Sequence, residues 1–81
     1  MKGDAETMRE LYKCLLLLPT VSRGAIENAI TAGKADRTPD AWRRAEAVTS
    51  TILQTLYVNG LLTVTECETL RKHYNKQIKR A

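Results

Sequence analysis

The sequence predicts an all-α fold: a compact bundle of three to four short helices that forms a single helical domain over residues 1–81. Apolar residues recur every three or four positions in four separate segments, which is the spacing of one helix face. Residues that cap or break helices stand between those segments. No segment alternates apolar and polar residues with the period of two that a strand requires. A chain of 81 residues, 43% of them hydrophobic, has enough apolar side chains for one modest core.

The first helix is expected over residues 5–18. Its apolar positions follow helical spacing and widen toward the end into the run Leu15–Leu18. A helical turn that is apolar nearly all round is either enclosed by the protein or part of an interface. Pro19 is expected to end this helix, because the residue before a proline is pushed out of the α region.

A short second helix is expected over residues 23–32. Ser22 is its predicted N-cap, and Val21 and Ile26 stand at the two positions of a hydrophobic staple. Gly33 suits the left-handed position that follows a helix C-terminus. We expect this short helix to close one end of the bundle.

The third helix has the strongest apolar period in the chain and is expected to form the centre of the core. Thr38 is its predicted N-cap, and Pro39 occupies the first helical position, where its missing N–H costs nothing. Asn59-Gly60 is expected to end it, and we expect it to pack against the first and fourth helices. Its apolar stripe comprises Trp42, Ala45, Thr49, Ile52, Leu53 and Leu56.

The fourth helix has two alternative starts. Thr63 with Glu66 forms the T-x-x-E pattern of a capping box, and Thr65 with Glu68 forms an overlapping one. The face that helical spacing turns toward the core comprises Cys67, Leu70, Tyr74 and Ile78.

The sequence lacks the residue patterns that carry catalysis or hold cofactors. It has one histidine and two cysteines, and it contains no phosphate-binding glycine loop and no metal-binding motif. Cys67 and His73 lie on one predicted helix with their side chains about 240° apart, so they cannot form a nucleophile–base pair. Cys14 and Cys67 each lie within an apolar pattern and are expected to be buried. We therefore expect no enzyme, no cofactor, no metal site and no small-molecule substrate.

No apolar run approaches the ~18 residues of a membrane span. Asp4 and Glu6 make the N-terminal segment unlike a signal peptide. Two cysteines are too few for the disulfide framework of a small secreted domain. We therefore expect a cytoplasmic protein with no membrane partner.

Apolar side chains exceed what four short amphipathic helices need for one small core. The surplus lies in the last turn of the first helix and around the end of the third. It predicts an interface, either with a second copy of the chain or with another protein. The function that fits is a small intracellular, non-catalytic regulator or adaptor that acts by protein–protein interaction. The candidate interface residues are Leu16, Leu17, Leu18, Tyr57, Val58, Leu61 and Leu62.

The alternative is a small basic regulator that binds DNA or RNA, since the formal net charge is +4. Residues 16–30 faintly resemble a helix-turn-helix in which Arg23 and Asn28 would face DNA. An ordinary capped helix is the other interpretation of that segment. Further candidate phosphate contacts lie on the outer face of the fourth helix, where basic residues also complement the helix dipole. They are Lys72, Lys76, Lys79 and Arg80.

Overall fold

The computed structural model describes the backbone of residues 3–79 and the side chains of residues 8–78. Nearly all of this part of the chain is helical, and it contains no strand, which confirms the predicted all-α bundle. The four helices are α1 (Gly3–Leu17), α2 (Thr20–Asp36), α3 (Pro39–Val58) and α4 (Val64–Lys79).

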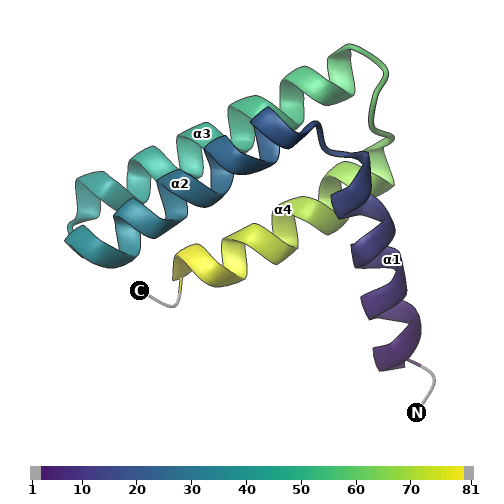
Figure 1. Cartoon of the computed structure of the whole chain (residues 1–81), viewed down its shortest axis with the longest axis horizontal. Coiled ribbons are helices and arrows are strands. Elements are labelled where there is room, and N and C mark those ends of the chain that lie inside the picture. The colour runs from purple at the N-terminus through teal and green to yellow at the C-terminus, as the bar shows by residue number, and fades with distance from the viewer. Residues whose placement is uncertain (1–2, 80–81) are drawn as a thin grey trace.

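The helices form a flat bundle of about 36 × 34 × 18 Å, in which α2 and α3 lie side by side as an antiparallel pair (Figure 1). α4 packs against that pair, and α1 packs mainly on α4 and leans away from the rest. We expected α2 to close one end and α3 to pack against α1, and both expectations were wrong. The connection of two residues between α2 and α3 favours antiparallel packing of those helices.

α2 begins three residues earlier than the sequence predicted. The carbonyl of Pro19 accepts the N–H of Arg23 at 2.9 Å, so the helix starts directly after the proline. Ser22 is therefore inside the first turn rather than at the cap. Val21 is 84% exposed and forms no staple with the buried Ile26. The proline that ends α1 thus also serves as the residue from which α2 starts.

α2 also ends later than predicted, because Gly33 serves packing rather than termination. Gly33 is buried inside the helix, where the indole of Trp42 lies against it. The left-handed position belongs instead to Arg37, with φ 55°, whose N–H donates to the carbonyl of Gly33 at 2.8 Å. A side chain other than glycine or asparagine is uncommon at such a φ.

The predicted starts of α3 and α4 are confirmed. The hydroxyl of Thr38 accepts the N–H of Ala41 at 3.2 Å. At α4, the N–H of Thr63 donates to Oε1 of Glu66 at 2.8 Å, and the N–H of Glu66 donates to the hydroxyl of Thr63 at 3.2 Å. This reciprocal pair is the predicted capping box, and it selects Thr63 over Thr65 as the cap.

The predicted end of α3 is confirmed as well. Gly60 has φ 78°, which glycine adopts without steric cost. Its N–H donates to the carbonyl of Tyr57 at 3.0 Å, and the N–H of Leu61 donates to that of Leu56 at 2.9 Å. These two bonds are a Schellman motif, which satisfies carbonyls that the end of a helix would leave without partners.

The core lies where α2, α3 and α4 meet and extends to the face of α1 that contacts α4. Trp42 and Ile52 are only partly buried, whereas their neighbours Ala45 and Leu53 have no exposure, so the buried face of α3 is turned slightly from the predicted stripe. The inner face of α4 is buried as predicted. The core residues are Cys14, Leu18, Ile26, Ile30, Ala45, Leu53, Leu56, Leu62, Cys67, Leu70, Tyr74 and Ile78.

Candidate protein interface at one end of the bundle

Five of the seven predicted interface residues are exposed, and two are not. Leu18 and Leu62 are buried in the core, with 5% and 4% exposure, so the prediction was wrong for them. Each lies in a connection between helices, next to an exposed leucine. In such a connection the backbone angles of a single residue decide whether its side chain faces the core or the solvent. The exposed five are Leu16, Leu17, Tyr57, Val58 and Leu61.

The structure adds two apolar residues that the sequence analysis missed. Val21 is exposed on the first turn of α2, and Val64 is 54% exposed on the first turn of α4. The sequence contained a signal for Val21: Ile26 belongs to the apolar pattern of this segment, and five residues along a helix turn a side chain by about 140°. Val21 must therefore point away from the core once α2 is extended back to Thr20.

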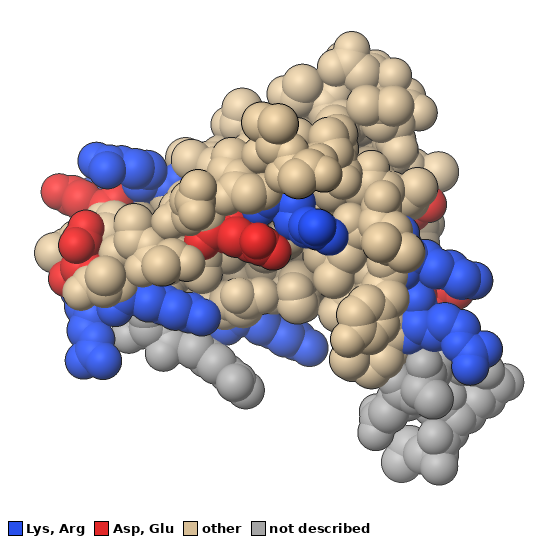
Figure 2. Space-filling view, viewed as in Figure 1, with Lys and Arg blue, Asp and Glu red and all other residues tan. Residues whose placement is uncertain are grey.

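These residues gather at one end of the molecule. The α1–α2 connection and the α3–α4 connection lie at the same end in Figure 1, and Leu18 and Leu62 from those connections belong to one buried cluster. The projecting corner where α3 passes into α4 carries only uncharged side chains (Figure 2, top right). We call this surface the apolar end. It comprises Leu16, Leu17, Val21, Tyr57, Val58, Leu61 and Val64.

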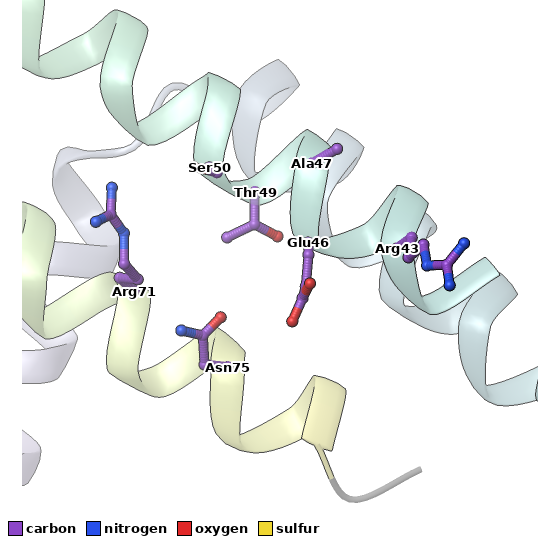
Figure 3. A pocket seen from close by; sticks show the side chains of 7 residues that line it. All are labelled: Arg43, Glu46, Ala47, Thr49, Ser50, Arg71 and Asn75. Carbon is purple, nitrogen blue, oxygen red and sulfur yellow. The ribbon is translucent and has the colours of Figure 1, made fainter. Parts of the chain in front are cut away.

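A polar groove of about 440 Å³ lies between α3 and α4, away from the apolar end. Glu46 and Thr49 on α3 point toward Asn75 on α4, and Arg71 points toward α3 (Figure 3). Among the residues that the structure describes, no hydrogen bond or ion pair crosses the groove, and the Thr49 hydroxyl donates to the carbonyl of Ala45 within its own helix. Neither cysteine nor the histidine lines this groove.

The two cysteines are buried, as expected for core residues. Sγ of Cys67 lies 3.2 Å from the carbonyl oxygen of Leu53, to which it donates. Burial raises the pKa of the Cys14 thiol, and the carboxylates of Glu66 and Glu10 raise it further. Burial also raises the pKa of Cys67. Both thiols are therefore poorer nucleophiles than an exposed cysteine, since the thiolate is the reactive form.

His73 is half-buried, and its ring is tied to its own helix. Nε2 of His73 lies 3.1 Å from Nε2 of Gln77. With the amide in this orientation its nitrogen donates to Nε2 of His73, an arrangement that fits the neutral ring with its proton on Nδ1. Burial lowers the pKa of His73, and the nearby Lys76 lowers it further. Residues 8–78 contain no group of three or more histidine, cysteine, aspartate or glutamate side chains that could hold a metal ion.

The structure does not bring the candidate nucleic-acid contacts of α2 onto one face. Arg23 and Asn28 are five residues apart and therefore about 140° apart around the helix. Arg23 is half-buried, while Asn28 is exposed. α2 pairs with α3 rather than with α1, so residues 16–30 do not form a helix-turn-helix unit.

On α4, Lys72 and Lys76 are exposed one turn apart and share a face. Basic side chains also lie along the edge of the molecule where α4 runs (Figure 2, lower edge). The other two candidates, Lys79 and Arg80, have side chains outside the described residues. The lysine pair is thus the part of the predicted nucleic-acid surface that the structure brings together.

Among the described residues, no helix has the length and apolar character needed to cross a membrane. No family model, curated protein or solved structure matches the chain.

Proposed function

We propose that this chain is a small non-catalytic interaction module, a regulator or adaptor, that binds protein through its apolar end. The observation that carries the proposal is the exposure of large aliphatic side chains there: Leu16, Val21 and Val58 are 79%, 84% and 70% exposed. Single exposed apolar residues are ordinary on protein surfaces, whereas a cluster of them indicates an interaction site.

The energetics of burial support this use of the surface. At such exposures a leucine or valine leaves on the order of 100 Å² in water. The other four side chains of the apolar end are 42–56% exposed, so the seven together leave on the order of several hundred Å² in water, against the ~800 Å² that each partner contributes to a standard protein interface. Burying apolar surface contributes roughly 25 cal/mol per Å², so the apolar end can drive association.

The chemistry of the remaining surface supports a non-catalytic role. The thiols of Cys14 and Cys67 are buried, and His73 is held by Gln77. The polar groove contains the hydroxyls of Thr49 and Ser50, but the first donates within its own helix and, among the described residues, no hydrogen bond joins the second to the Glu46 carboxylate.

The test is affinity capture from an extract of the cells that make the protein, with and without nuclease. Val21→Glu and Leu61→Glu place a charge in the apolar end, and Ala32→Glu adds the same charge on an exposed position of α2 far from it. We expect a nuclease-resistant protein to bind the parent and the Ala32→Glu variant, and to be lost from the other two. Equal capture by all four chains would exclude the apolar end.

A nucleic-acid-binding regulator is the second candidate, and it depends on the exposed pair Lys72 and Lys76. Lysines at a helix surface contact phosphate without reading sequence. A fluorescence-anisotropy titration against random duplex DNA and against single-stranded RNA at low salt tests it. Binding that weakens in Lys72→Ala and Lys76→Ala, and that falls steeply with salt, would favour this candidate. Nuclease-sensitive capture in the experiment above would favour it too.

A further inference from the structure

The apolar end is formed by two long stretches of sequence that contain no charged residue. No charged residue lies between Lys13 and Arg23, and none lies between Glu46 and Glu66. The first stretch contains the α1–α2 connection, and the second contains the last half of α3 and the α3–α4 connection. Because these connections lie at one end (Figure 1), the fold brings the uncharged stretches together. On the face shown in Figure 2, charges of both signs lie away from the corner where α3 passes into α4.

Two polar side chains at this end, Thr55 and Asn59, have partners within their own helix. The hydroxyl of Thr55 donates to the carbonyl of Thr51 at 2.8 Å, and Nδ2 of Asn59 donates to the carbonyl of Thr55 at 2.8 Å. The backbone N–H groups of residues 59–61 are satisfied at the end of α3. These groups therefore keep their partners when water is removed from this surface, so their desolvation costs little.

We propose that the occupant of the apolar end is a second copy of this chain, in a two-fold symmetric dimer. This rests on the proposed function, namely that the apolar end binds protein. In a two-fold dimer the same patch supplies both sides of the interface, so it must be complementary to itself. The residues of the apolar end are themselves uncharged, and the two charged side chains that line a pocket beside Tyr57 and Val64, Glu68 and Arg71, are of opposite sign.

The charge of the chain favours a second copy over a partner of different composition. With a net charge of +4, the chain would recognise an acidic partner through its basic faces, by electrostatic attraction. The apolar end has no charge with which to select such a partner. Its residues carry no positive charge that would repel a second copy. The exposed area of the seven side chains is on the order of several hundred Å², which is in the range of the smaller specific protein interfaces.

The experiment is sedimentation equilibrium on the full chain over a range of micromolar concentrations, with dilution-dependent amide shifts by NMR to locate the contact. Val21→Glu is the main variant, because an acidic side chain in the first turn of α2 complements the helix dipole and keeps the monomer folded. Leu61→Glu is the second variant, and Ala32→Glu is the control for added charge. Circular dichroism checks that each variant remains helical.

We expect the parent and Ala32→Glu to sediment at twice the monomer mass of 9.1 kDa. We expect Val21→Glu and Leu61→Glu to weaken the dimer at least tenfold, with dilution shifts confined to residues 14–22 and 57–64. A parent chain that stays monomeric, or a dimer that both variants leave intact, overturns the inference. If the parent is monomeric but captures a different protein that Val21→Glu loses, the second-copy inference fails and the proposed function stands. If it is monomeric and captures nothing, both fail.

Discussion

Gly33 of α2 and Trp42 of α3 are in direct contact across the helix pair. A β-carbon at position 33 would stand 3.0 Å from Cε3 and 3.1 Å from Cζ3 of the indole. The absence of a side chain on Gly33 therefore lets the two helices approach at this point. It also explains why a glycine stands inside a helix, where it is less favourable than alanine by about 1 kcal/mol.

Gly33→Ala is expected to destabilise the fold by about 1 kcal/mol. Alanine would gain helix propensity, but the rigid ring would have to move, and overpacking costs about 1–3 kcal/mol. Gly24, on the same helix, has no atom within 4 Å of a β-carbon placed there. Gly24→Ala is therefore expected to stabilise the protein by up to about 1 kcal/mol. Urea denaturation measures both changes. In a Trp42→Ala background Gly33→Ala should become stabilising, and a change that stays destabilising there would show that the indole is not the cause.

Tyr74→Phe is expected to leave the stability unchanged or to raise it by roughly 1 kcal/mol. The tyrosine is 2% exposed, and its hydroxyl has no hydrogen-bond partner among the described residues. A buried hydroxyl without a partner costs about 1–3 kcal/mol, and phenylalanine removes that cost with little change in shape. Tyr12→Phe, at an exposed position of α1, is the control and should change nothing. A loss of more than about 1 kcal/mol in Tyr74→Phe would mean that the hydroxyl does have a partner.

Leu53→Ala is expected to lower the free energy of unfolding by about 2–5 kcal/mol, the usual cost of a large-to-small change in a core. Leu53 has no exposure and lies at the centre of the buried face of α3. The neighbouring Gln54 is exposed on the same helix, and Gln54→Ala should cost less than about 0.5 kcal/mol. Chemical denaturation compares the two variants. Similar small losses in both would place the core on another face of α3.

Stability is expected to fall as the pH is lowered through the range just below 6.5, in part because of His73. Burial and Lys76 hold the pKa of His73 below its ordinary value, so the unfolded chain takes up this proton at a higher pH than the folded chain. The contribution of the neutral ring to the free energy of unfolding is thus complete above pH ~6.5. It is lost as the pH falls to the pKa that His73 has in the folded chain. NMR titration of the ring and urea denaturation at two pH values, compared with His73→Gln, measure it. A ring pKa at or above ~6.5 would contradict the prediction.

Residues 38–79 could be predicted from sequence because their structural signals are local. Thr38, the Thr63–Glu66 pair and Gly60 each act within a few residues of themselves, and the bonds they make are those that their spacing implies. The length of α2 could not be predicted in this way. Gly33 is locally a terminator, and its actual role depends on Trp42, which belongs to the next helix.

The candidate interface was predictable in location but not in every residue. Surplus apolar residues in two segments indicated a contact surface, and the fold brings those segments to one end. The inward orientation of Leu18 and Leu62 depends on the backbone path of two short connections. The spacing of apolar residues in the sequence does not predict that path. Val21 was missed for the related reason that the start of α2 was placed too late.

The arrangement of the helices also has a consequence for the order in which the chain folds. α2 and α3 are joined by two residues, whereas α1 makes its main contact with α4, at the far end of the chain. Closing that long loop costs more chain entropy than forming the hairpin. We therefore expect the α2–α3 hairpin to be largely formed in the folding transition state and α1 to dock after it. Changes such as Leu53→Ala should then slow folding, while Leu15→Ala on α1 should mainly speed unfolding, and the two limbs of a chevron plot would separate these effects.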